Sequence, residues 1–430
     1  MGYDGLSTSA LAMHIGRPIT VFRFLLLTTL VVGAMGNARA QDASGVPKPA
    51  TTVVAAAVAT QVEGDRTQFR VTLSEPVEAS AHLMEGPDRV IVDLPEVAFH
   101  LAAENGKKRD GLIASYRYGL FAPGRSRVVI DLAEPAVVAN IRAERDASGS
   151  ASTLVVELKR VERDEFRRAQ VASVATMAPT ASPSRPAMAE TRDDRPRIVI
   201  DPGHGGIDPG AAGANGIVEK DLVLGFAQLL KKKLESSGSY KVVLTRDNDA
   251  FVSLGDRVRA ARAAKADLFI SIHADSLAGG QDVRGLTVYT GSERASDADS
   301  ARLADRENKA DAVAGIDSSE GPDEVLDILQ ELTSRETRTF SHRFAGRLVG
   351  ELDAVAQLNK NPRREAGFKV LRAHDVPSVL LELGYLSSRK DLDLLISDEW
   401  RSKAIASMAV AIDRFFATRL ARQGAAAVSP

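Results

Sequence analysis

Two histidines occupy positions in this 430-residue sequence where chemistry is expected. His204 lies in the glycine-rich run "IVIDPGHGG", directly after β-branched residues, and His273 lies at the end of the apolar stretch "LFISIHAD". Functional groups of open α/β sheets gather at the carboxyl ends of strands. We therefore predict that the two imidazoles meet at one metal site, where the glycines turn the backbone sharply and leave His204 open to solvent.

A hydrolytic zinc site takes three protein ligands and keeps a fourth position for water, so the third ligand should be a histidine or a carboxylate. The chain has no cysteine, which excludes thiolate ligands. Glu219, in "GIVEKDLVLGF", begins a predicted helix at the end of the glycine-rich loop. An acid there also has an ordinary explanation in the helix dipole. Two histidines and a glutamate equally suit manganese or another divalent ion.

Glu382 is the second carboxylate of interest, because "SVLLELGYLS" places it among Leu380, Leu381 and Leu383 at the end of an apolar strand. A carboxylate in such surroundings is costly unless it is paired, hydrogen-bonded or close to a metal. We therefore assign Glu382 to the same site. The other histidines of the mature chain are expected not to be ligands, although His374 is the nearest to Glu382 in sequence; they are His82, His100, His342 and His374.

The elements that must position these residues fall into two parts. Residues 197–420 alternate apolar strands with helical periodicity, which predicts an α/β domain with a largely parallel sheet. Residues 61–160 contain short alternating strands and predict an all-β domain. Two of those strands, "DRVIVDLPE" and "SRVVIDLAEP", indicate either a repeated unit of a sandwich or two ordinary buried strands. Residues 161–196 begin with a charged stretch of helical character and become rich in Pro, Ala and Ser, so we expect a flexible linker.

Residues 1–40 have the features of a secretory signal peptide: Arg17 and Arg23, an apolar core, and the small-residue site Ala38-Arg39-Ala40. The alternative of an uncleaved anchor is disfavoured because the apolar run is short. The two arginines are not adjacent, which favours the general secretory route over twin-arginine export. No second apolar run predicts a membrane span in the mature chain. Its net charge of −4 leaves no basic footprint for nucleic acid.

The four motifs "IDPGHGG", "VEK", "SIHAD" and "LLELGYLS", in this order, resemble the zinc-dependent N-acetylmuramoyl-L-alanine amidases of the Amidase_3 type. Residues 61–160 resemble the AMIN domain, a peptidoglycan-binding β module that precedes such amidases in the division-associated branch. The resemblance implies a zinc ion bound by His204, Glu219 and His273, with Glu382 as the catalytic carboxylate.

The same resemblance implies the reaction and its place. The substrate would be peptidoglycan, cleaved at the amide between the lactyl group of N-acetylmuramic acid and the L-alanine of the stem peptide. The enzyme would act in the periplasm, in wall remodelling and the separation of daughter cells. Zinc would supply activated water and polarise the scissile carbonyl, and Glu382 would transfer the proton.

Residues 292–338 interrupt the alternation of strands and helices with an amphipathic pattern that is rich in acids, alanine and serine. A helix with few large apolar residues is weakly held and easily displaced. In the branch that the sequence resembles, an inserted helix occludes the active site until a LytM-type activator moves it. We predict that Glu307, in "DRENKAD", takes the open zinc position. The competing acids are Glu293, Asp305 and Asp311.

Two other functions compete with the amidase. A wall-binding scaffold with an inactive hydrolase domain would require the loss of a ligand or of Glu382, and all four residues are present. A nucleotide-binding interpretation of "GHGG" lacks the Lys-Ser/Thr pair of a P-loop and the spacing of a dinucleotide fingerprint.

Overall fold

The computed structural model describes residues 52–101, 106, 109–145, 151–175, 193, 195–276, 284–316 and 328–426. Thr51–Pro430 form one compact unit. The predicted signal peptide, residues 1–40, and its cleavage site lie outside the described residues. Within the described ranges, no helix is both long enough and apolar enough to cross a bilayer.

The N-terminal part is all β, as predicted, and consists of two sheets around one apolar core. Antiparallel neighbours dominate both sheets, and their alternating side chains fill the space between them. The first sheet has the order β5 (Val97–Phe99), β1 (Val53–Glu63), β2 (Arg66–Leu73), β9 (Ser152–Arg160), β8 (Ala136–Arg145). The second has the order β3 (Ser80–Met84), β4 (Arg89–Pro95), β7 (Arg125–Leu132), β6 (Ile113–Ala122).

The two similar sequence stretches form the central strands of the second sheet. β4 and β7 pair antiparallel, with Ile91 opposite Val129 and Asp93 opposite Arg127. Both strands are buried over most of their length, which accounts for their runs of β-branched residues. Their likeness therefore reflects equivalent places in one sheet.

The predicted linker begins with a helix. Helical character was expected at the start of residues 161–196, and α1 (Arg163–Ala175) is a helix there; the sequence did not show that it packs against β3. Its Phe166 is fully buried in the core of the β domain. Burial of this aromatic side chain and the ion pairs of Arg163 with Asp88 and of Arg167 with Glu85 hold the helix to the β domain.

The C-terminal part is an α/β domain whose sheet is mixed. Of its five strand pairs, four are parallel, and the fifth, β13 with β15, is antiparallel. The prediction of a largely parallel sheet is confirmed. The order is β11 (Lys241–Leu244), β10 (Arg197–Pro202), β12 (Leu268–His273), β15 (Ser378–Glu382), β13 (Leu286–Gly291), β14 (Leu358–Ala366).

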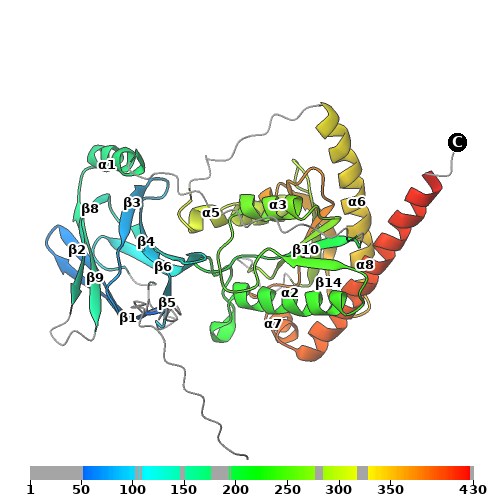
Figure 1. Ribbon diagram of the computed structural model, residues 1–430, viewed down its shortest axis with the longest axis horizontal. Helices are drawn as coiled ribbons and strands as arrows, with labels where there is room; N and C mark the ends of the chain where they lie inside the picture. Colours follow the sequence, from blue (N-terminus) through cyan, green and yellow to red (C-terminus); the bar gives the residue numbers. More distant parts are fainter. Residues whose placement is uncertain are drawn as a thin grey trace, which may run out of the picture. The chain divides into compact units, whose positions relative to one another are not determined.

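Helices cover both faces of this sheet, which explains the continuous apolar character of its central strands. Along β10, Ile198 and Ile200 face one apolar core and Val199 faces the other. The first core is completed by α2 (Glu219–Glu235), α6 (Ile328–Leu352), α7 (Arg389–Leu395) and α8 (Asp398–Ala426). The second is completed by α3 (Leu254–Ala263), α4 (Ala298–Glu307) and the turn η2 (Lys369–Leu371). Figure 1 shows α2 and α3 on opposite sides of β10.

Three parallel strands end together at one edge of the sheet. Pro202 at the end of β10 pairs with Ile272 of β12, and His273 pairs with Glu382 at the end of β15. The chain leaves the sheet at these points, so the residues that the sequence singled out meet at the carboxyl edge of adjacent strands.

Candidate metal centre

The loop after β10 holds His204 in an unusual backbone conformation. His204 has a φ of 58°, in the left-handed region that side-chain-bearing residues rarely adopt. The prediction that its imidazole is open to solvent was wrong, because the residue is only 8% exposed. Strain of this kind persists only where the surroundings enforce it, and it is concentrated at functional sites.

The nearby glycines are required by close approach of the predicted ligands. A Cβ on Gly203 would lie 2.4 Å from the ring of His273. A Cβ on Gly210 would lie 2.7 Å from both the His204 ring and the carboxylate of Glu219. The glycines thus make room for the other ligands and do not expose His204 to solvent.

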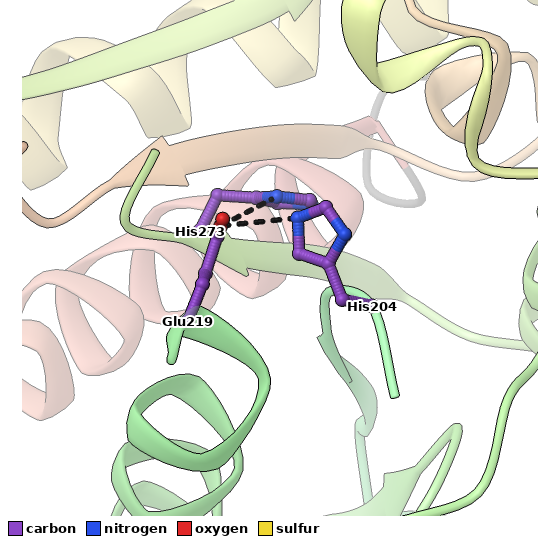
Figure 2. Close-up of side chains that lie close together, drawn as sticks. All are labelled: His204, Glu219 and His273. Carbon is purple, nitrogen blue, oxygen red and sulfur yellow. Dashed lines mark ion pairs between the residues drawn. The ribbon is translucent and has the colours of Figure 1, made fainter. Parts of the chain in front are cut away.

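The three predicted ligands converge on one point (Figure 2). Glu219 Oε1 lies 3.2 Å from His204 Nε2 and 3.2 Å from His273 Nδ1. Both nitrogens are buried and have no hydrogen-bond partner. Donor atoms around a tetrahedral zinc, each about 2.0–2.1 Å from the ion, lie roughly 3.3 Å apart. The spacing, the donor types and the unpartnered nitrogens therefore fit a divalent metal.

Glu219 is the first residue of α2, yet its carboxylate does not cap its own helix. Oε1 accepts a hydrogen bond from Ala274 N at 2.8 Å, and Oε2 accepts one from Ala211 N at 2.9 Å. Burial raises the pKa of Glu219, but His204 and His273 outweigh burial and hold that pKa well below its usual range. The side chain is a fixed, fully buried carboxylate between the two imidazoles.

Asp208 orients His204 from the other side of the ring. Its Oδ2 lies 2.9 Å from His204 Nδ1, and its Oδ1 accepts from Gly210 N. An Nδ1–H that donates to Asp208 leaves the Nε2 lone pair facing Glu219, as a metal ligand requires. Burial lowers the pKa of His204, but nearby carboxylates, Glu219 foremost, outweigh it and raise that pKa well above its ordinary value. The site therefore attracts cations.

Two buried arginines hold the carbonyl groups of the His204 loop. Arg257 pairs with the buried Asp201 at 2.7 Å and donates to the carbonyls of Pro202 and His204, each at 2.8 Å. Arg246 donates to the carbonyls of Gly203 at 2.7 Å and Pro202 at 3.0 Å. Charge-assisted bonds to successive carbonyls fix a loop that backbone preference alone would not maintain.

Glu382 lies beside His273 on the neighbouring strand and is fully buried. Its Oε2 accepts from Asp275 N at 3.1 Å, and its Oε1 has no hydrogen-bond partner. Burial, together with the charges of Asp275, Glu219 and Glu307, raises the pKa of Glu382 well above its ordinary value. Burial, followed by the charges of Glu307 and Glu219, raises the pKa of Asp275 to about 7. Asp275 is therefore a carboxyl group that can hold or release a proton near neutral pH, and Glu382 holds its proton to a higher pH than an ordinary glutamate.

Glu307, at the end of α4, faces the same point. Its Oε2 lies 3.2 Å from His273 Nδ1 and 3.5 Å from His204 Nε2, and the residue is 6% exposed. Of the competing acids, Glu293 and Asp305 are exposed, and Asp311 accepts a hydrogen bond from Leu254 N instead. The space that His204, His273 and Glu307 line measures about 10 Å³, which is room for about one water molecule.

The insert is held by more contacts than its sequence predicted. Leu303 and Ala304 of α4 are buried in the second core of the sheet. Arg306 pairs with Asp275 at 2.6 Å and donates to the Ser276 carbonyl at 2.8 Å. The buried apolar contact of α4 itself is confined to these two side chains, worth about 2–3 kcal/mol if fully buried, so polar contacts supply much of the attachment of this helix.

The other histidines take no part in this cluster. Among the described residues, the group with metal-ligand spacing contains His204, Glu219 and His273 alone. The other four histidines that the structure describes lie outside this group; they are His82, His100, His342 and His374.

Comparison with known proteins agrees with this arrangement. Residues 198–414 match the N-acetylmuramoyl-L-alanine amidase family, Amidase_3, and residues 57–158 match the AMIN domain. The chain is 33% identical over 356 residues to the N-acetylmuramoyl-L-alanine amidase AmiC of Neisseria meningitidis serogroup B. The matched region covers 79% of this chain and 85% of that relative. The chain belongs to the N-acetylmuramoyl-L-alanine amidase family. It is therefore a hydrolase.

Two further relatives are also N-acetylmuramoyl-L-alanine amidases by name. AmiC of Escherichia coli O6:H1 is 30% identical over 377 residues, covering 83% of this chain and 89% of the relative. AmiA of Escherichia coli K12 is 36% identical over 220 residues, covering 51% of this chain and 75% of the relative. The two AmiC matches span both parts of this amidase, and the AmiA match spans about half of the chain.

Sequence reasoning missed the groups that support the site in this amidase. Asp208 follows His204 by four residues, and Asp275 follows His273 by two. Asp201 is a lone acid in the apolar strand "RIVIDP", and a lone buried acid predicts a buried partner. That partner is Arg257, whose position in the helical stretch "LGDRVRAARAAKA" does not distinguish it from its exposed neighbours.

Replacing Asp208 with asparagine is expected to weaken divalent-metal binding about 10- to 100-fold, because the substitution removes the carboxylate that orients His204. Competition between the protein and a chromophoric chelator measures this affinity without reference to catalysis. Asp247→Asn, at an exposed acid, is the matched control. Equal affinities in the two variants would show that Asp208 does not support the ligand.

Proposed function

We propose that this amidase is a zinc enzyme that cleaves the amide between the lactyl group of N-acetylmuramic acid and the L-alanine of the peptidoglycan stem peptide. His204, Glu219 and His273 would hold the metal. The observation that carries the proposal is the convergence of these three donors: Glu219 Oε1 lies 3.2 Å from each imidazole nitrogen, and both buried nitrogens have no hydrogen-bond partner. Zinc bound there would polarise the scissile carbonyl and lower the pKa of water.

Glu382 is the proposed catalytic carboxylate. It takes the proton from the attacking water and delivers it to the amide nitrogen that leaves with L-alanine. Its free Oε1 is the atom available for that proton, since Oε2 accepts from Asp275 N. Negative charge on Glu307 contributes to its raised pKa. Withdrawal of Glu307 and entry of water therefore both lower the pKa of Glu382 and favour the carboxylate form that a base requires.

Glu307 is the proposed inhibitory ligand. Its distances to the two imidazole nitrogens, 3.5 and 3.2 Å, are close to those expected of a fourth donor around the same centre. The small space that remains supports a resting state from which a glycan-linked peptide is excluded. Residues 292–338 would form the regulatory insert, and a LytM-type activator of the division machinery would displace it.

The remaining assignments follow from the resemblance and the family. Residues 1–40 would direct the chain through the general secretory route to the periplasm. Residues 61–160 would target the enzyme to peptidoglycan or to the septum. Residues 197–420 would carry out hydrolysis during daughter-cell separation.

The test uses the chain from Gln41 onward, purified and analysed for metal by mass spectrometry and for peptide release from wall sacculi. We expect about one zinc per chain and released peptides that begin with a free L-alanine amine. Manganese in place of zinc would correct the metal and leave the reaction intact. A chain without metal, with no peptide release from the Glu307→Ala variant either, would favour the wall-binding scaffold.

A further inference from the structure

The part of the regulatory insert that follows α4 is bound by a sheet of the β domain. After α4, the chain forms the short helix α5 (Ala310–Val313). Arg89 of β4 donates to the carbonyl of Ala312, and Arg117 of β6 donates to that of Val313 at 2.7 Å. Arg127 of β7 donates to the carbonyl of Ala314 at 2.9 Å. Three neighbouring strands thus contribute one arginine each to three consecutive carbonyls.

These arginines, Arg89, Arg117 and Arg127, are called the arginine face below. Acids of the same sheet hold them in place: Asp131 pairs with Arg89 at 2.7 Å and with Arg117 at 2.6 Å. Asp93 accepts two hydrogen bonds from Arg127, at 2.6 and 3.0 Å. Buried charges are stable when they are paired. Pairing with Asp131 and Asp93 fixes the direction in which the remaining N–H groups of the arginines point. The donors are therefore pre-arranged for acceptors such as backbone carbonyls.

Apolar contact surrounds these bonds. Ala314 packs in one cluster with Ile91 and Val129 of the β domain and with Ile207 and Phe251 of the catalytic domain. Contact of this kind excludes water, which strengthens the charge-assisted bonds beside it.

Gly315 fits this contact in a way that no larger residue could. It has a φ of 71°, in the left-handed region, and a Cβ there would lie 2.3 Å from Ile91 Cδ1. Any side chain at position 315 would therefore be strained by the backbone and would collide with β4. Substitution of Gly315 separates the two surfaces without changing the arginine face or the metal ligands.

The bound carbonyls lie five to seven residues beyond Glu307, and α4 and α5 are separated only by Asn308 and Lys309. Movement of α4 away from the imidazoles must therefore shift α5 or bend the short connection. Lys369 N and the Gly367 carbonyl bond to the side chain of Asn308, which ties that connection to the catalytic domain.

We propose that the arginine face is an intramolecular docking site for residues 312–314, and that it holds the insert in the position where Glu307 closes the metal centre. The β domain then takes part in inhibition, in addition to any role in targeting. An activator that lifts the insert must also separate three guanidinium groups from their carbonyl acceptors. The inhibitory half of this inference rests on the role proposed for Glu307, whereas the docking half does not.

The test compares Gly315→Val and Arg117→Gln in the chain from Gln41 onward. Asp131 keeps Arg89 as a partner in the second variant. Arg142→Gln is the control, because this arginine pairs with Glu144 in the other sheet. A loss of about 1–2 kcal/mol in the free energy of docking corresponds to a roughly 5- to 30-fold shift of the docking equilibrium towards the undocked state. For both test variants we expect a rise of the same size in the rate of amide hydrogen exchange of residues 310–316 and in basal peptide release. We expect no change in either quantity for the control.

Each outcome decides one half of the inference. Unchanged exchange at residues 310–316 in both variants would overturn the docking site. Faster exchange without a rise in activity would overturn its role in inhibition, provided that Glu307→Ala is active in the same assay. If Glu307→Ala is itself no more active than the parent, the inhibitory role of Glu307 fails, and the exchange data still decide the docking site. Should Arg117→Gln unfold the β domain, Gly315→Val decides alone, since it alters no residue of that domain.

Discussion

Replacing Glu382 with glutamine is expected to reduce the turnover of stem-peptide release about 10²- to 10⁴-fold, the range typical of a lost general acid or base. Glutamine keeps the size of the side chain and an oxygen that can accept from Asp275 N. It cannot take up a proton from water at neutral pH. The loss should therefore appear in kcat, measured by liquid chromatography of peptides released from sacculi.

The background for this experiment should be Glu307→Ala, so that the parent has activity to lose. Glu382 is not among the clustered donors, and metal content should stay at the parental value. The exposed Glu399, which pairs with Lys403 on α8, provides the control Glu399→Gln. A double variant that keeps both its metal and more than a tenth of the turnover would exclude Glu382 as the proton carrier.

Replacing Glu307 with glutamine is expected to raise basal activity roughly 10- to 150-fold in the absence of an activator. The estimate takes the carboxylate's contribution to closure as one bond to a charged group, about 1.5–3 kcal/mol. Glutamine keeps the shape of the side chain but loses the charge that a metal or a protonated imidazole would attract. Initial rates of peptide release, at equal metal content, measure the effect.

Asp305→Asn is the matched control for this prediction, since Asp305 is an exposed acid on the same helix, two residues before Glu307. Activation by both substitutions would point to a general loosening of α4 and not to a released ligand. No activation by Glu307→Gln, with metal bound and with the Glu382-dependent reaction intact, would refute the proposed inhibition.

Local sequence patterns predicted the elements well. Apolar runs identified β10, β12 and β15, and helical spacing identified α2, because strands covered on both faces and amphipathic helices leave a local record in residue order. The boundary after the β domain was predicted less well. The charged stretch at the start of residues 161–196 indicated helical character, but its sequence did not show that the helix packs into the β-domain core through Phe166.

The helical periodicity of α4 also distinguishes Glu307 from the competing acid Asp305. Ser300, Leu303, Ala304 and Glu307 are the buried residues of α4, and their spacing of three, one and three marks one face of a helix. Asp305 falls on the opposite face. This pattern distinguishes the two acids, provided that the buried face of the helix is known to cover the metal centre.

Sequence alone was enough to predict the metal-ligand candidates, the strand ends that carry them and the two-part organisation, because these depend on residue type and short-range spacing. The tertiary structure decided that His204 is buried, that Asp208 and Arg257 support it, and that the arginine face meets residues 312–314. Arg127 and Ala314 are 187 positions apart. Contacts at that separation leave no periodic trace in the sequence, because they arise only when independently folded surfaces pack together.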